Sequence, residues 1–170
     1  MGFDAFANIA GIPGESTDEN HQGWIELTSY SHSITQPSGG PRSTAGGGST
    51  GRANFGNFEI VKPIEKCDPK LALYACNGTA IPTIDISICQ AAGNKQEYMH
   101  YKLENCIVAH VEHLGTSEKK EGTEAEERPM IRYGFNCGKI TWTYTETDHT
   151  TGQAKGNMSN HWDLTSNTGG

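Results

Sequence analysis

Long apolar runs are missing from this chain of 170 residues. No stretch approaches the roughly 18 apolar residues that a membrane-spanning helix needs. The N-terminus reads MGFDAFANIAGIPGES, with an acid where a secretory signal has a basic start and an apolar core. We therefore expect a protein that is made in the cytosol, is not inserted into a membrane, and needs no cleaved signal if it is exported.

An excess of positive charge is also missing. The 20 acidic residues outnumber the 13 basic ones, and the formal net charge is −7. Binding of nucleic acid without sequence preference relies on Lys and Arg to neutralise phosphates. The composition therefore argues against nucleic acid as a partner, while a net charge of this size keeps a monomer or small assembly in solution.

Regularly spaced cysteines are absent. The five Cys are an odd number and include no C-x-x-C pair. This pattern favours a reducing compartment with free, mostly buried thiols over a disulfide framework. A disulfide between Cys89 and Cys106, on two strands that we expect to pair, is a geometrically conceivable alternative.

Motifs of catalysis and metal binding are missing as well. The glycine-rich segment 36–52 contains no lysine and no G-x-x-x-x-G-K-[ST], and no serine lies in G-x-S-x-G. His110 and His113 are three apart on an expected strand, so they would face opposite sides, and we interpret them as structural or solvent-exposed. We expect no enzyme, no cofactor and no metal; a hydrolase without a recognisable motif is an alternative.

Bulky apolar side chains are few and glycines are many. Hydrophobic residues make up 34% of the chain, and 21 residues are glycine. Short-turned β structure suits this composition better than a helical bundle, which needs many Leu and Ala. At this length we expect one domain, spanning residues 1–170.

The clearest pattern present is the alternation over residues 96–111, QEYMHYKLENCIVAHV. Apolar residues recur at every second position from Met99 to Val111, interrupted only by Asn105, and the opposite face, with Lys102 and Glu104, is mostly polar. Successive side chains of a strand point to opposite faces. The period of two therefore predicts a long antiparallel strand with one buried face.

Turn and alternation signals predict about eight strands and one helix, which suggests a small antiparallel β-barrel or sandwich. The helix should have Asp68 as its N-cap, Pro69 at the first helical position and Gly78 in the left-handed C-terminal turn. Segments 36–52, 118–127 and 165–170 are expected to be a flexible glycine-rich loop, an acidic loop and a tail. The remaining strands are expected at residues 3–9, 24–33, 53–62, 81–90, 131–136, 139–145 and 161–164, with a polar segment at 148–160.

Several of these segments, taken in order, resemble the Hcp family, the haemolysin-coregulated proteins of bacterial type VI secretion systems. The resemblance runs from Phe3 to Leu164 and is specific as an ordered set, although each short motif is weak alone. Its pieces are Gly14-Glu15-Ser16, His21, Trp24-Ile25, the helix from Cys67 to Gly78 with Asp68 and Pro69, the run Gly93-Asn94-Lys95-Gln96-Glu97-Tyr98, Lys139 to Tyr144 with Trp142, and Trp162-Asp163-Leu164.

The resemblance implies a small β-barrel with one short helix at its side, assembled as a hexameric ring. Rings of this family stack into a tube that a contractile sheath expels behind a spike protein, with small effectors in the lumen. The chain would then be cytoplasmic before firing and secreted afterwards. As lumen-facing candidates we take Ser29, Ser31 and Ser33, and as ring or stacking candidates Gly39, Gly40, Arg42, Gly46, Gly47, Gly48, Lys102 and Glu104.

A monomeric β-barrel that binds a small ligand or a sugar in its mouth is the alternative function. Trp24, Trp142 and Trp162 could form an aromatic platform for a carbohydrate, although tryptophans are more often core or interface residues. Ring-shaped particles would distinguish the tube subunit from this alternative.

Overall fold

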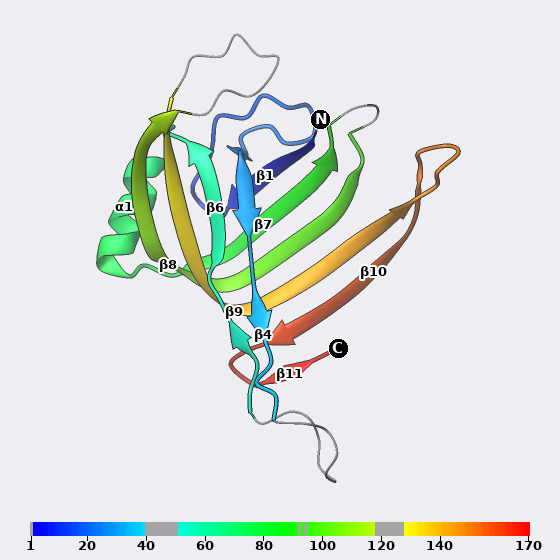
Figure 1. Ribbon diagram of the computed structural model, residues 1–170. Helices are drawn as coiled ribbons and strands as arrows, with labels where there is room; N and C mark the ends of the chain where they lie inside the picture. Colours follow the sequence, from blue (N-terminus) through cyan, green and yellow to red (C-terminus); the bar gives the residue numbers. More distant parts are fainter. Residues whose placement is uncertain (1, 40–50, 92, 94, 118–127) are drawn as a thin grey trace.

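Two long antiparallel strands form the centre of the molecule, β8 (Glu97–Ser117) and β9 (Pro129–Thr147). The computed structural model describes residues 2–39, 51–91, 93, 95–117 and 128–170, and Figure 1 shows a strongly curved sheet with one helix at its side. The remaining elements are β1 (Phe3–Ile9), β2 (Ile25–Leu27), β3 (Ser29–Ser31), β4 (Ile34–Thr35), β5 (Asn54–Phe55), β6 (Phe58–Pro63), α1 (Asp68–Asn77), β7 (Ile81–Gln90), β10 (Ala154–Asp163) and β11 (Thr168–Gly169).

The strand order of the main sheet is β11-β10-β9-β8-β7-β1-β2, and β6 pairs with both β9 and β3. The mainly β fold with one short helix is as predicted, but no ladder closes the sheet into a barrel among the described residues. The reason lies at Thr28, between β2 and β3. Leu27 pairs with β1, whereas the Thr28 N–H donates to the Val61 carbonyl of β6 at 2.8 Å. The chain therefore crosses from β1 to β6 at this point, and no continuous ladder joins these two strands.

The core is built from short apolar side chains that meet across three neighbouring strands. On β7, Ile84, Ile86 and Ile88 are buried opposite the small or aliphatic residues of β1. On β8, Leu103 lies opposite Ile84 and is buried as well. This face of the sheet is the apolar face that the alternation predicted.

The buried face of β8 changes at Asn105, which has a φ of 53°. Before it the odd-numbered Leu103 points into the core, and after it Cys106 and Val108 do so. The expectation that alternation continues to Val111 is therefore wrong, and Ile107 is 42% exposed. A residue with a left-handed φ interrupts the extended backbone, and Asn tolerates that conformation better than most residues.

Several further strand boundaries differ from those predicted. Segments 24–33 and 53–62 are each split, while 131–136 and 139–145 are joined in β9 without a break. In the polar segment 148–160, β10 already begins at Ala154, and the expected tail contains β11. Most β10 side chains are exposed, so the strand depends on backbone pairing with β9 and leaves no hydrophobic pattern.

The pairing of Cys89 with Cys106 that the sequence allowed is not found. Cys106 lies opposite Cys137 on the β8–β9 ladder, and Cys89 lies opposite Glu97 at the far end of β7. All five cysteines are free thiols.

Helix α1 follows the prediction at its C-terminus and departs from it at its start. Gly78 has a φ of 69° and its N–H donates to the Tyr74 carbonyl at 2.9 Å, the expected left-handed cap. The N-cap position, however, is Cys67, and Asp68 is the first helical residue. The Asp68 carboxylate turns back and accepts the Glu65 N–H at 2.6 Å, and Pro69 follows in the first turn.

A buried ion pair ties the start of α1 to the sheet. The Lys62 ammonium on β6 is fully buried and donates to both oxygens of Asp68, at 2.8 and 3.0 Å. The Tyr133 hydroxyl of β9 donates to the same carboxylate at 2.6 Å, and burial raises the pKa of Tyr133 so that it stays a donor. A buried charge requires this degree of compensation, because removing one partner leaves the other unpaired in the interior.

Replacing Lys62 with Met should destabilise the fold, because the Asp68 carboxylate would remain buried without its cation. We expect the free energy of unfolding, measured by urea denaturation, to fall by about 3–5 kcal/mol. The exposed Lys66→Met change is the matched control and should alter it by less than about 0.5 kcal/mol. Equal effects of the two changes would show that the buried pair does not anchor the helix.

Candidate functional site

The polar face of the sheet, on the side opposite the core, extends across β7, β8, β9 and β10. Rows of opposed residues cross it from strand to strand, and one of them runs from Ser87 through His100 and Thr143 to Ser159. The Thr143 and Ser159 hydroxyls lie 3.1 Å apart. We call this surface the polar face; its other members include Asp85, Lys102, Glu104, Lys139, Thr141 and His161.

The segment before β2 folds over one end of the polar face. The His21 ring stacks on Phe6 at 4.3 Å between centroids, and Trp24 lies edge-on against His21 at 4.9 Å. Gly14 permits this path, because a Cβ there would clash with the Trp24 carbonyl. Phe6 therefore becomes buried although it lies on the side away from the main core.

A chain of polar contacts connects this segment to β7 and β8. His21 Nδ1 donates to Asp18 at 2.8 Å, and His21 Nε2 lies 3.0 Å from the Ser87 hydroxyl. The Ser87 hydroxyl in turn donates to Glu97. The residues that carry the family resemblance near positions 14–24 and 93–98 thus meet in one place.

His100 continues the chain on β8 and is held as a cation. Its Nε2 lies 3.0 Å from Asp85, and its Nδ1 lies 3.3 Å from Glu97. Hydrogen bonds to Asp85 and Glu97 raise the pKa of His100 to about 9. Burial acts to raise the pKa of Glu97, but the hydrogen bonds from His100 and Ser87 together outweigh it and leave that pKa lowered.

Asp18 is the anionic end of the network. It accepts from Lys95 Nζ at 2.7 Å as well as from His21, and the Asn20 N–H donates to it at 3.2 Å. The hydrogen bonds from Lys95 and His21 lower the pKa of Asp18 to about 2. Lys95 comes from the turn between β7 and β8, so this contact joins that turn to the segment before β2.

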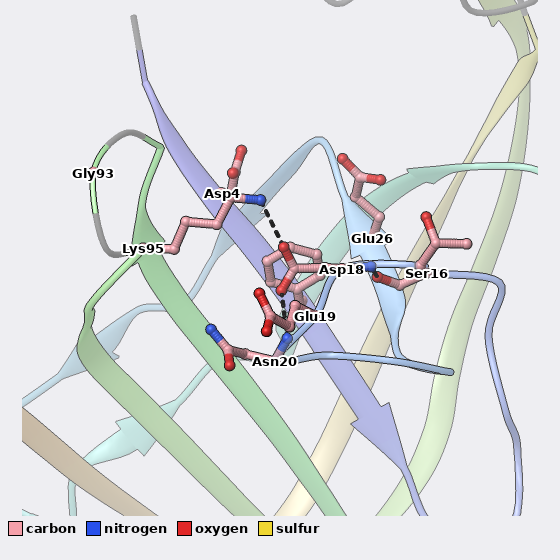
Figure 2. Close-up of a pocket in the computed structure, with 10 residues that line it drawn as sticks. Asp4, Ser16, Asp18, Glu19, Asn20, Glu26, Gly93 and Lys95 are labelled. Atoms are coloured by element: carbon pink, nitrogen blue, oxygen red, sulfur yellow. Dashed lines mark hydrogen bonds and ion pairs between the residues drawn. The ribbon is translucent and has the colours of Figure 1, made fainter.

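Beside Asp18 an open pocket of about 770 Å³ lies at the same end of the sheet (Figure 2). Figure 2 shows Lys95 reaching across it from the β7–β8 turn, with carboxylates around it. Its lining is acidic, since one lysine faces four carboxylates. These are Asp4, Asp18, Glu19 and Glu26.

The order Asp18, His21, Ser87 has the chemical sequence of a hydrolytic triad, so its geometry matters for the hydrolase alternative. A nucleophile must be reached by its substrate, but Ser87 is fully buried. Its hydroxyl proton is directed to Glu97 rather than to His21. The contacts therefore fasten the covering segment to the sheet and do not present a reactive group.

His110 and His113 are the histidines whose spacing in the sequence raises metal ligation. His110 and His113 are both exposed on β8, and His110 lies 3.5 Å from Glu112. Within the described ranges, no group of three His, Cys, Asp or Glu residues could hold a metal ion.

An apolar row of the core face continues beyond the core. Ile88, Met99, Tyr144 and Met158 are opposed in turn across β7, β8, β9 and β10. Ile88 is buried, but Tyr144 is 45% and Met158 is 73% exposed. We call Tyr144 and Met158 the apolar extension; Figure 1 shows β10 at the outside of the sheet there.

The serine candidates lie on an exposed surface. Ser29, Ser31 and Ser33 are all exposed in and after β3, and Ser31 donates to Glu59 at 3.4 Å. Among the ring candidates, Lys102 is exposed, Glu104 lies 3.7 Å from Lys139, and Gly39 is exposed. The candidates Gly40, Arg42, Gly46, Gly47 and Gly48, and the predicted acidic loop 118–127, lie outside the described residues.

The structure does not gather the three tryptophans into one platform. Trp24 precedes β2 at one end of the strand order and contacts His21. Trp142 and Trp162, on β9 and β10 near the other end, pack against the core. Of the remaining motif residues, Gln96 and Tyr98 are half-buried at the start of β8.

Sequence reasoning missed two features of the site. Asp18 and Ser87 were not singled out, because neither lies in a motif and their contact through His21 spans 66 residues of sequence. The apolar extension was missed because residues 148–160 were expected to be a polar segment and the last strand was expected only at 161–164. The only signal for it was Met158, an isolated apolar residue in a polar stretch.

Comparison with known proteins agrees with this architecture. The family model described as "Type VI secretion system effector, Hcp" matches residues 6–144. A solved type six secretion system protein is 28% identical, with a TM-score of 0.86 over 99% of both chains. Hcp1 from Salmonella typhimurium is 25% identical, with a TM-score of 0.73 over 99% of both chains, and a type VI secretion system effector from Yersinia pestis, at 24% identity and a TM-score of 0.70, covers 94% of this chain and 99% of its own and shares the fold.

No curated protein matches the chain. Within the described residues no helix has the length and apolar character required to span a bilayer.

The raised pKa of His100 predicts a specific dependence of stability on pH. The folded-state pKa of about 9 exceeds the unfolded value of 6.5, so the stabilisation is complete below pH 6.5 and is lost as the pH rises through 9. We expect the free energy of unfolding to fall by about 1–2 kcal/mol over this window, allowing for partial solvent screening.

His100→Gln should flatten that part of the pH profile, measured by urea denaturation at several pH values. The exposed His113→Gln change is the matched control and should leave the slope as in the parent protein. A slope that persists in His100→Gln would show that another group is responsible.

Proposed function

Because the chain belongs to the Hcp family of type VI secretion system effectors, we propose that it is a structural subunit of the secretion tube. Six copies form a ring, and rings stack into a tube that a contractile sheath expels behind a spike protein. The lumen carries small effectors. The subunit waits in the bacterial cytoplasm and leaves the cell with the tube; it has no catalytic role and needs no cofactor.

The apolar extension is the observation that carries this proposal. Tyr144 and Met158 continue a row of core residues onto an exposed surface, at the outer strand of the sheet. Beyond them, β11 pairs with β10 only at Trp162 and Asp163, and the outer edge of residues 154–160 has no ladder partner in the part of the chain that the structure describes. An unpaired edge beside exposed apolar side chains is suited to a second protein surface.

A ring requires that this surface meet a different surface of the next copy. A head-to-tail contact of this kind closes when the rotation between copies divides a full turn. β11 and β10 stand at one end of the strand order and β2 at the other, so the two ends of the sheet are unlike. We propose that the apolar extension makes a heterologous contact of this kind with the next copy.

The polar, solvent-exposed surfaces of the subunit line the channel and form the outer wall of the proposed tube. We place Ser29, Ser31 and Ser33 in the lumen, because small exposed hydroxyls do not obstruct cargo and remain satisfied by water. Lys102 and Glu104, on the polar face, are candidates for contacts between subunits. A ring reconstruction that puts β3 on the outer wall would remove the lumen assignment.

Stacking would join opposite ends of two subunits. The acidic pocket lies at the end of the sheet near the N-terminus, and β4 extends from the other end (Figure 1). Segment 36–52, which connects β4 to β5, carries Arg42 and Arg52 and no acidic residue. We propose that this segment reaches the acidic pocket of the next ring, where opposite charges favour contact.

The apolar extension gives a direct test of ring formation. Met158→Asp should abolish rings and leave a folded monomer, because a charge would be desolvated at the contact while the core of the subunit is untouched. Light scattering after gel filtration and negative-stain images would follow the change. The parent protein should give rings, which a monomeric ligand-binding protein would not form.

Leu73→Asp is the matched control, since Leu73 is also exposed and apolar but lies on α1. It should leave rings intact. Rings that survive Met158→Asp would place the contact elsewhere, and an absence of rings in the parent protein at every concentration and salt would contradict the tube proposal itself.

Stacking can be tested by deletion and by charge exchange. Removing residues 39–48 should abolish tubes while rings persist in the images. Arg52→Glu and Glu19→Lys should each shorten tubes, and the double variant should restore them because it re-creates an opposite pair. Tubes of unchanged length in the deletion variant and in both single variants would show that this segment and pocket do not meet.

A further inference from the structure

Two thiols face each other at the centre of the β8–β9 ladder. Cys106 and Cys137 are directly opposed residues, and their Sγ atoms lie 2.9 Å apart. Residues opposed on antiparallel strands have the Cα separation that a disulfide requires. Of the five cysteines, which all lie in the described part of the chain, these two are the ones that contact each other.

The two thiols differ in their access to solvent. Cys106 is fully buried, whereas Cys137 is half-buried and lines a cavity of about 60 Å³ together with His32, Phe55 and Leu164. This space is large enough for a water-sized reagent such as hydrogen peroxide.

We propose that Cys137 and Cys106 form an oxidation site at which a peroxide converts the two thiols into a cross-strand disulfide. The Cys137 sulfur attacks one oxygen of hydrogen peroxide, the O–O bond breaks, and water leaves with the thiol proton, which produces a sulfenic acid. The Cys106 sulfur then attacks the Cys137 sulfur, the S–O bond breaks, and a second water takes the Cys106 proton. Two thiols are oxidised and one peroxide is reduced to two waters.

The roles of the two sulfurs follow from their surroundings. The contact with Cys137 and burial both raise the pKa of Cys106, which keeps it a thiol and makes it a poor first nucleophile. Cys137 borders the cavity and meets the peroxide first. Cys106 is then the resolving thiol, already in contact with the sulfur that it must attack.

The disulfide would link the two strands on which the sheet depends. It closes a chain segment of 32 residues, from Cys106 to Cys137. A native cross-link of this kind restricts the unfolded state, and we expect the unfolding midpoint of the oxidised protein to rise by about 5–10 °C.

The experiment uses the full chain with the exposed Cys76 replaced by Ser, which removes linkage between copies. The reduced protein is treated with hydrogen peroxide, unfolded, alkylated and analysed by peptide mass spectrometry. We expect free thiols to fall by two per chain, a linked peptide that contains Cys106 and Cys137, and full reversal by dithiothreitol. Recovery of both residues as alkylated thiols, or a link to Cys67 or Cys89, would overturn the proposal.

Two variants separate the roles of the sulfurs. Cys106→Ser should stop the reaction at a Cys137 sulfenic acid, which dimedone traps as a stable adduct. Cys137→Ser should leave Cys106 unmodified under the same conditions. Dimedone labelling of Cys106 in Cys137→Ser would reverse the assignment. Since the primary readout is the linked peptide in the protein with both thiols, instability of either variant does not affect it.

Discussion

The pairing of β8 with β9 is the interaction on which the other elements depend. β7 pairs along β8, while β6 and β10 occupy different parts of β9. Each hydrogen bond of an antiparallel ladder pairs a backbone N–H with a backbone C=O that burial would otherwise leave without a partner. The two long strands therefore hold the neighbouring strands without leaving buried backbone groups unpaired. Part of the sheet extends beyond the core, where Tyr144 and Met158 are exposed.

Two polar clusters hold the non-sheet segments against this framework. The Lys62–Asp68 pair fastens α1 from one side, and the Asp18–His21–Ser87 contacts fasten the segment before β2 over the polar face. Both are satisfied throughout, and within the described ranges no buried side-chain nitrogen or oxygen lacks a partner. Buried polar groups are directional, so they fix where a segment lies more sharply than apolar packing alone does.

The sequence predicted the elements that depend on residue patterns within a short stretch of chain. β1 and β7 appear with the predicted bounds, and Gly78 ends α1, because alternation and left-handed glycine are properties of short stretches. The phase change at Asn105, the course of β10 and the partner of Cys106 depend on contacts from distant residues. The polar face was predicted from Lys102 and Glu104, but the contacts of Asp18 with Lys95 bridge 77 residues and leave no local pattern.

The position of the apolar extension is compatible with a chain that folds on its own and assembles with copies of itself as proposed. Tyr144 and Met158 lie on strands already secured by backbone pairing, so their exposure does not threaten the fold. Exposed apolar surface beside a strand edge that has no ladder partner among the described residues is a liability unless something covers it. In the proposed ring the next subunit would cover this surface, and closure would give each copy both neighbours.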